Sequence, residues 1–150
     1  MKKILITGGT VFVSRYAAQY FVDKGYEVYV VNRNSRPQVP GVKLIETDRH
    51  DLGDKLKYIY FDVVADITAY NAEDITDLCD SLGSFGQYIM ISSSAVYPEY
   101  GDQPFREDSE RALNRYWGSY GTDKIAIGNQ LVMLPGIMWG QNLSLVTIWG

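Results

Sequence analysis

The sequence predicts an α/β fold built on a doubly wound, mostly parallel sheet flanked by helices. Two observations support this prediction. An apolar run at residues 4–6 leads into a glycine turn and then into a helical apolar period, and a second buried run follows at residues 28–31. The same alternation of strand and helix patterns continues along the chain. We therefore expect five to seven strands, with a ligand crevice outside their carboxyl ends.

Length and composition fit a single domain, residues 1–150, and argue against several classes of protein. A chain of 150 residues can build one packed core, and its net charge of −4 gives no electrostatic footprint for nucleic acid or for a membrane surface. We see neither a signal peptide nor a stretch as long as a membrane span, so we expect a cytoplasmic protein. The one cysteine, Cys79, excludes a disulfide within the chain and lies in an apolar helical pattern that favours a packed thiol.

The first unit has the order of a Rossmann fold: strand, glycine turn, helix and strand. After the turn, the apolar residues fall on one stripe of a 3.6-residue helix, namely Val13, Tyr16, Ala17, Tyr20 and Phe21. Gly25 follows this stripe and is free to take the left-handed conformation that ends a helix.

The glycine turn is a candidate phosphate site, because backbone N–H groups at the start of a helix lack partners and attract anions. We expect the pyrophosphate of a dinucleotide to be held by Gly8, Gly9, Thr10, Val11 and Phe12. The usual Gly-x-x-Gly-x-x-Gly positions hold Gly8, Val11 and Ser14 in this chain. A plain strand–helix corner without a ligand is therefore the alternative interpretation.

The polar loop after the second strand bears on the choice of cofactor. Folds that bind NAD usually place an acidic residue here for the adenosine ribose, but this chain has Asn32, followed by Arg33 and Arg36. Arginine side chains can fork onto a 2′-phosphate, which favours NADP over NAD; the alternative is a solvated loop with two surface arginines. Asp48, just after a strand expected at residues 42–47, is a candidate acceptor for the adenine amino group.

The later elements follow the same alternation. We expect a short helix over residues 52–60, strands over 62–68 and 87–91, and a helix from Tyr120 that ends by about residue 130, cut short at Gly128. The strand at 62–68 runs into Ala69 and Tyr70, where a cofactor can lie against the backbone, and Asn71 then caps a helix that runs to about residue 82.

A serine-rich strand end and a Tyr-x-x-x-Lys pair are the candidate chemistry. Ser92, Ser93 and Ser94 follow the strand at 87–91, and Tyr120 and Lys124 lie on one face of the last predicted helix. An ammonium next to a phenol stabilises the phenolate, so Tyr120 is expected to act as a general acid and base. An exposed helical pair is the alternative. The single histidine lies in a loop and has no neighbouring cluster of metal ligands in the sequence.

Together these stretches resemble a family. ILITGGTVFVSRY, DITAY, ISSSAVYPE and YGTDK occur in the order seen in the extended short-chain dehydrogenase/reductase family, in its NAD(P)-dependent nucleotide-sugar epimerase/dehydratase branch. The resemblance implies a catalytic set of Ser93 (with Ser94 as the alternative), Tyr120 and Lys124, in which Lys124 also holds the cofactor ribose. It also implies hydride transfer on a small-molecule substrate such as a nucleotide sugar, and a homodimer made by the helices at residues 72–82 and 120–130.

The chain also departs from this family. Ser94 and Ala95 stand where family dehydratases often carry Asp and Glu, which favours epimerase or reductase chemistry over loss of water. Residues 131–150 are atypical, because family members have about twice this length and supply most of the sugar-nucleotide pocket from their second half. The last ten residues are expected to form an extra strand, an interface or an out-of-register tail. A catalytically inactive nucleotide-binding module and a truncated family member therefore remain as alternatives to an active enzyme.

Overall fold

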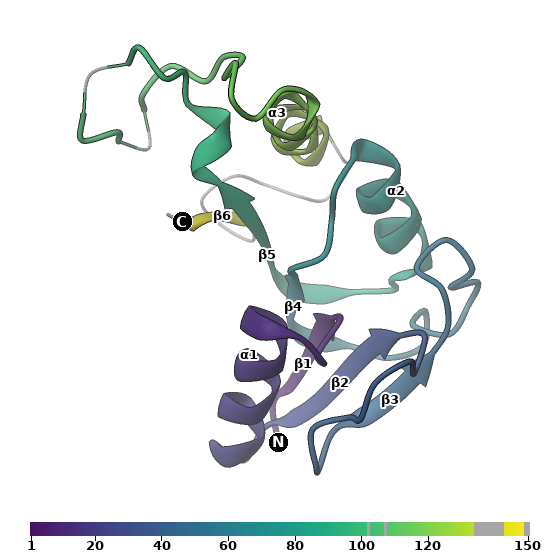
Figure 1. Ribbon diagram of the computed structural model, residues 1–150. Helices are drawn as coiled ribbons and strands as arrows, with labels where there is room; N and C mark the ends of the chain where they lie inside the picture. Colours follow the sequence, from purple (N-terminus) through teal and green to yellow (C-terminus); the bar gives the residue numbers. More distant parts are fainter. Residues whose placement is uncertain (102, 107, 134–142, 149–150) are drawn as a thin grey trace.

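A computed structural model describes residues 1–101, 103–106, 108–133 and 143–148. Its six strands form one parallel sheet in the order β3-β2-β1-β4-β5-β6, with α1 on one face and α2 and α3 on the other (Figure 1). This confirms the predicted doubly wound α/β fold. The elements are β1 (Lys3–Thr7), α1 (Phe12–Asp23), β2 (Glu27–Asn32), β3 (Lys43–Glu46), β4 (Phe61–Asp66), α2 (Ala72–Ser81), β5 (Phe85–Ser93), the single 3₁₀ turn η1 (Ser94–Val96), α3 (Ser119–Met133) and β6 (Leu143–Ile148).

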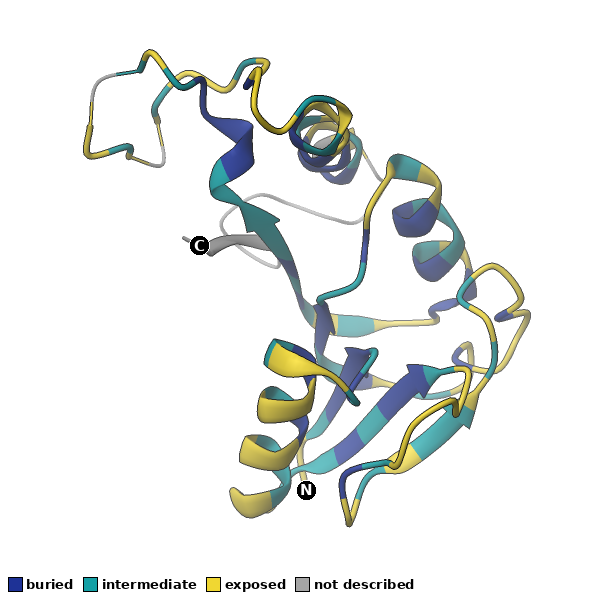
Figure 2. Ribbon diagram, in the orientation of Figure 1, coloured by how far each residue is buried: buried dark blue, intermediate teal, exposed yellow. Residues whose placement is uncertain are grey.

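Two apolar cores lie on opposite faces of the sheet, because side chains alternate along each strand. In β1, Ile4 and Ile6 pack with Ala18 of α1, whereas Leu5 packs with residues of α2 and α3. Side chains on both faces of β1 are buried, and the inner strands are the most deeply buried part of the fold (Figure 2). Continuous apolar runs therefore mark the strands that are covered on both faces.

The strand order changes direction at β1, which pairs with β2 on one side and with β4 on the other. Ile6 lies opposite Val30 of β2 and opposite Ala65 of β4. The chain leaves β1 and β4 on opposite faces of the sheet, so their carboxyl ends are not covered by a crossing connection. The carboxyl edge of the sheet is therefore open at this switch point, and the predicted site residues lie along it.

The glycine turn after β1 needs glycine at two positions. Gly8 and Gly9 have φ of +89° and +88°, in the left-handed region that favours glycine. A Cβ on Gly9 would lie 2.6 Å from Cγ1 of Val30 in β2, which is closer than atoms can pack. The Gly8 amide donates to the Val31 carbonyl oxygen at 2.9 Å. The turn is therefore held tightly against β2.

The helix α1 was predicted with the correct ends but with a partly wrong buried face. Tyr16 and Tyr20 of the predicted stripe are 74% and 46% exposed, while Ser14 and Ala18 are buried. Small side chains at these two positions let α1 approach the sheet closely, and the large tyrosine rings of the predicted stripe then project outwards. The end of the helix is as predicted, because Gly25 has φ of +78°.

Two other expectations about helices were wrong. Residues 53–58 form hydrogen-bonded turns, not a helix, and Gly53 takes a left-handed backbone (φ +52°), which interrupts a helical path. Leu52 and Leu56 still anchor this segment in the core. The last helix does not end at Gly128: α3 continues to Met133, because Ile127 and Leu131 on either side of the glycine are fully buried.

Residues 143–148 form β6, which confirms the extra strand, one of the three alternatives given for the last ten residues. Its backbone pairs in parallel with residues 88–93 of β5. Residues 134–142, which belong to the stretch predicted to be atypical, lie outside the described residues. Among the described helices, none has both the length and the apolar character that crossing a bilayer requires.

We predict that Gly9→Ala destabilises the fold more than Gly25→Ala. Both positions have a left-handed backbone, which costs an alanine about 1–2 kcal/mol. Only Gly9 also faces a neighbour, because nothing lies within 4 Å of a Cβ built on Gly25. Urea unfolding should show an additional loss of about 1–3 kcal/mol in the free energy of unfolding for Gly9→Ala. Equal losses for the two variants would contradict the proposed contact with Val30.

Candidate functional site

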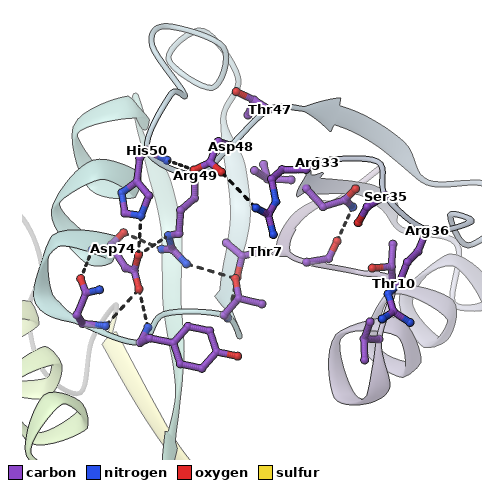
Figure 3. Close-up of a pocket in the computed structure, with 17 residues that line it drawn as sticks. Thr7, Thr10, Arg33, Ser35, Arg36, Thr47, Asp48, Arg49, His50 and Asp74 are labelled. Atoms are coloured by element: carbon purple, nitrogen blue, oxygen red, sulfur yellow. Dashed lines mark hydrogen bonds and ion pairs between the residues drawn. The ribbon is translucent and has the colours of Figure 1, made fainter. Parts of the chain in front are cut away.

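Two pockets open along the carboxyl edge of the sheet, on either side of the switch point. The β1–β3 pocket, of about 570 Å³, lies outside the ends of β1, β2 and β3 (Figure 3). The β5–α3 pocket, of about 520 Å³, lies between the start of α1, the end of β5 and α3. Val11, Thr68 and Tyr70 line both pockets. The pockets therefore meet at the glycine turn and can hold the two ends of one elongated ligand.

The glycine turn accommodates its two departures from the usual glycine spacing. Val11 has an extended backbone and precedes α1, and the left-handed conformation falls on Phe12, with φ of +44°. Ser14 is buried, and its hydroxyl donates to the Val11 carbonyl oxygen at 2.8 Å. The side chain of Phe12 is 85% exposed and lines the β5–α3 pocket. The turn keeps its shape, although Val11 and Phe12, the last two residues of the predicted phosphate site, carry apolar side chains.

The polar loop after β2 contributes three of the predicted cofactor residues to the β1–β3 pocket. The Asn32 side-chain amide donates to the Gly8 carbonyl oxygen at 2.6 Å and to Gln38 at 3.0 Å. It therefore joins the loop to the glycine turn. The Arg33 guanidinium lies 3.9 Å from the Asp48 carboxylate across the pocket, and both side chains are largely open to solvent (Figure 3). Arg36 also lines this pocket.

A buried polar network at the base of the β1–β3 pocket was missed by our sequence analysis. The carboxylate of Asp66, at the end of β4, is fully buried and accepts from Thr7 at 2.8 Å and from Tyr88 at 2.7 Å. Arg49 donates to both of its oxygens, at 3.4 and 3.1 Å. The available signal was an aspartate inside an apolar strand, since a buried acid requires partners elsewhere in the chain.

Burial and the Asp66 carboxylate also set the protonation of this network. Burial raises the pKa of Tyr88 well above its ordinary value, and the nearby carboxylate adds to this. Burial disfavours the charged form of Arg49, but Asp66 and Asp74 outweigh this effect and raise its pKa. Tyr88 therefore stays a neutral donor and Arg49 stays a cation. Burial also raises the pKa of the Cys79 thiol to about 12, which fits the predicted packed thiol.

The three predicted catalytic residues lie together in the β5–α3 pocket. Lys124 is buried, and its ammonium donates to the carbonyl oxygens of Ala69 at 2.6 Å and Ile91 at 3.1 Å. Burial lowers its pKa, and the neighbouring carboxylates of Asp66 and Asp74 oppose that effect. The ring of Tyr120 lies with its centroid 5.9 Å from the Lys124 ammonium nitrogen. The Ser93 hydroxyl accepts from the backbone amide of Ala95 at 3.2 Å, at the start of η1.

The remaining predicted contacts are found at the junction of the pockets. The Ala69 carbonyl oxygen holds Lys124, and the Tyr70 ring lies 5.7 Å from the same ammonium nitrogen. Tyr70 is 62% exposed and lines both pockets. The structure thus brings Ala69 and Tyr70 next to the residues predicted to be catalytic, a proximity that sequence order alone does not show.

The loop histidine contacts α2. His50 Nδ1 lies 2.5 Å from a carboxylate oxygen of Asp77, and Nε2 lies 3.4 Å from Asp74. His50, Glu73 and Asp77 can each offer one donor atom within 4.8 Å of the others. The sequence did not indicate this cluster, because its members lie in two separate segments.

We predict that the pKa of His50 lies above its ordinary value, because Asp77 accepts a hydrogen bond from the ring and Asp74 and Asp48 add negative charge. The contribution of protonated His50 to the stability of the fold is fully present below its unfolded-state pKa, near 6.5. This contribution is lost as the pH rises through the raised folded-state pKa of His50. Asp77→Asn should move the pKa down. His50 is the only histidine, so an NMR titration of its ring reports this directly.

Asp80→Asn is the matched control for this titration, since it removes a carboxylate from the same helix without removing a partner of His50. A His50 pKa at or below its ordinary value in the unmodified protein would contradict the contact with Asp77. Equal shifts in the two variants would attribute the effect to the general charge of α2.

Comparison with known structures supports the fold. A crystal structure of UDP-glucose 4-epimerase matches with a TM-score of 0.77 at 20% identity, covering 99% of this chain and 51% of that chain. The NAD-dependent NDP-hexosamine 5,6-dehydratase TunA, involved in tunicamycin biosynthesis, matches with a TM-score of 0.78 at 20% identity, covering 98% of this chain and 54% of that chain. At this level of identity the similarity establishes the fold alone.

Comparison with curated proteins and family models extends this result to the sequence. The chain is 30% identical to the chloroplast stem-loop binding protein of 41 kDa b of Arabidopsis thaliana, over 92% of this chain and 40% of that protein. It spans less than half of that relative and about half of the matched structures. The model of the NAD dependent epimerase/dehydratase family matches residues 4–133, which is most of the chain. The chain therefore belongs to the NAD-dependent epimerase/dehydratase family, as the sequence motifs predicted.

Proposed function

We propose that this chain is the dinucleotide-binding domain of an NAD(P)-dependent oxidoreductase of the short-chain dehydrogenase type, residues 1–150 forming one such domain. The observation on which the proposal depends is that the two pockets meet at the glycine turn, with Tyr120 and Lys124 in the second pocket. A dinucleotide has the same two-ended form, with its pyrophosphate between two nucleosides. The left-handed backbone of Gly8 and Gly9 leaves room for a pyrophosphate against the turn.

The residues present fit the cofactor. A Cβ on Gly8 would lie 3.0 Å from Thr68 and 3.1 Å from the Ser14 hydroxyl. The turn therefore has little room for any side chain at this position. The ammonium of Lys124 has three N–H donors, of which two are used on backbone carbonyl groups. Within the part of the chain that the structure describes the third has no acceptor, and we propose that it donates to a ribose hydroxyl group. Asp48, at the far end of the β1–β3 pocket, supplies an acceptor for the adenine.

The chemistry follows from the second pocket. When bound, the nicotinamide supplies a hydride acceptor for the carbon that bears the substrate's hydroxyl group. Tyr120 takes the proton from that hydroxyl group as general base, and the positive charge of Lys124 favours this transfer. Ser93 orients the same oxygen. Return of the hydride to the opposite face of the oxidised carbon, with return of the proton from Tyr120 to its oxygen, would complete an epimerisation.

The substrate we propose is a nucleotide sugar or a similar alcohol. Three aromatic side chains line the β5–α3 pocket beside the catalytic set, those of Phe12, Tyr70 and Trp117, and exposed rings suit the apolar face of a sugar ring. The matched structures are named as a UDP-glucose epimerase and an NDP-hexosamine dehydratase. Ser94 and Ala95 supply no additional acid or base, which favours epimerisation or reduction over dehydration. We further propose a cytoplasmic homodimer that pairs through α2 and α3.

We favour NADP over NAD as the cofactor. Arg33 and Arg36 line the β1–β3 pocket next to Asn32, where an acidic side chain would repel a 2′-phosphate. Arg33 has only a loose, exposed ion pair with Asp48, which a phosphate can displace at little cost. The ratio of the dissociation constants of NADPH and NADH measures this preference.

A second candidate is a binding module that keeps the nucleotide pocket without turnover. The observation that favours it is the 30% identity to a relative whose name describes stem-loop binding, since a stem-loop is a nucleic-acid element. The net charge of −4 argues against a large phosphate-binding surface on this chain. The two candidates differ in whether the protein needs the Tyr120 hydroxyl group for its function.

We predict that Tyr120→Phe lowers turnover about 10²- to 10⁴-fold, the usual contribution of a general base. Binding of NADH should be unchanged, because the phenol hydroxyl group is not needed to hold the pyrophosphate. The measurement is steady-state turnover with UDP-glucose as the first probe of a nucleotide-sugar panel, alongside NADH fluorescence. Tyr116→Phe is the matched control, since Tyr116 is 71% exposed and lies outside the β5–α3 pocket.

Equal turnover in Tyr120→Phe and the unmodified protein would remove Tyr120 from the mechanism. Retained NADH binding without turnover of any nucleotide sugar in the unmodified protein would favour the binding module. A stem-loop RNA that binds with a steep salt dependence would support that second candidate further.

A further inference from the structure

We propose that Asp74 is a positioning residue for Lys124, and that it acts through the peptide group between Ala69 and Tyr70. The inference rests on the proposed function, in which Lys124 holds the cofactor and assists Tyr120. Asp74 lies at the start of α2, outside the β5–α3 pocket, and does not itself touch the proposed reacting atoms.

One peptide group connects the two side chains. The Asp74 carboxylate accepts from the Tyr70 amide at 2.6 Å, and the Ala69 carbonyl oxygen of the same peptide accepts from the Lys124 ammonium at 2.6 Å. An anion at the N–H end and a cation at the C=O end each polarise the peptide in the same direction, so the two hydrogen bonds strengthen one another. Asp74 and Lys124 are both buried, which limits screening by water.

Asp74 is itself fixed from two sides. It belongs to the capping box of α2, in which its amide donates to the Asn71 side chain at 3.0 Å and its carboxylate accepts from the Asn71 amide at 3.2 Å. Arg49 lies 3.3 Å from the carboxylate and donates to the Asp74 carbonyl oxygen at 2.7 Å. Arg49 is in turn held by Asp66 at the base of the β1–β3 pocket.

Besides capping α2, Asp74 affects the charge of Lys124. Burial favours the neutral amine of Lys124, and the nearby Arg49 cation favours it further. The carboxylates of Asp66 and Asp74 oppose both effects. The rings of Tyr70 and Tyr120 also face the ammonium group. Asp74 therefore helps to keep Lys124 charged and to hold it at the Ala69 carbonyl group.

The test is competitive acetylation of Lys124, read by peptide mass spectrometry between pH 7 and 11, in the unmodified chain and in Asp74→Asn. The exposed Lys24 and Lys55 are internal references. Loss of the carboxylate should lower the Lys124 pKa and raise its relative acetylation rate at pH 8 about three- to tenfold. This assay needs neither cofactor nor turnover.

Two control variants separate positioning from structure. Asn71→Ala weakens the same capping box but keeps the carboxylate, and Asp77→Asn removes a different charge from α2. Both should leave the Lys124 pH profile unchanged. If Asp74→Asn does not fold, Asp74→Gln replaces it, because glutamine at this capping-box position retains an acceptor without the charge.

An unchanged Lys124 profile in the Asp74 variant would overturn the inference, as would an equal change in Asn71→Ala. Failure of both NADPH and NADH to bind the unmodified protein would instead overturn the proposed function and leave the labelling result standing. The two failures are therefore distinguishable.

Discussion

The buried carboxylate of Asp66 holds the open edge of the sheet together. It accepts from Thr7 at the end of β1, from Tyr88 in β5 and from Arg49 after β3, so a single side chain joins four segments. A buried charge without partners costs several kcal/mol, and removal of one partner leaves the rest of the network unsatisfied. The Thr7 hydroxyl also accepts from the backbone amides of residues 67 and 68. These hydrogen bonds fix the position of the turn after β1 relative to the loop after β4.

Both pockets depend on that position. The loop after β4 separates them, and it presents the Ala69 carbonyl group to Lys124 in one pocket and Tyr70 to both. The glycine turn tolerates Val11 because this residue keeps an extended backbone and has an exposed side chain. It tolerates Ser14 because the serine hydroxyl donates a hydrogen bond to the Val11 carbonyl oxygen. Two of the usual glycines are therefore dispensable for the shape of the turn, while Gly9 is not.

Much of this arrangement could be predicted from the sequence. Changes of apolar period located the strands and helices, and the order of the glycine turn, serine-rich strand end and Tyr-x-x-x-Lys pair predicted which side chains would meet. The prediction of the buried face of α1 was partly wrong because it placed the large tyrosines inside and left out the small Ser14 and Ala18. Close packing of the helix on the sheet requires small side chains at the contact. The network around Asp66 was missed because its hydrogen-bonded side chains lie far apart in the sequence, 59 residues for Thr7 and Asp66, and only the fold brings them together. The roles of Ser93, Tyr120 and Lys124 in catalysis remain predictions.

Binding of a dinucleotide at the glycine turn is the central claim, and parallel titrations with NADPH and NADH test it most directly. Reduced-nicotinamide fluorescence and thermal stability can be followed in the same samples. We expect a micromolar dissociation constant, equivalent to about −8 kcal/mol, with NADPH bound more tightly than NADH. Tighter binding of NADH would contradict the role given to Arg33 and Arg36. Absence of binding by either nucleotide at millimolar concentration would contradict the assignment of the two pockets.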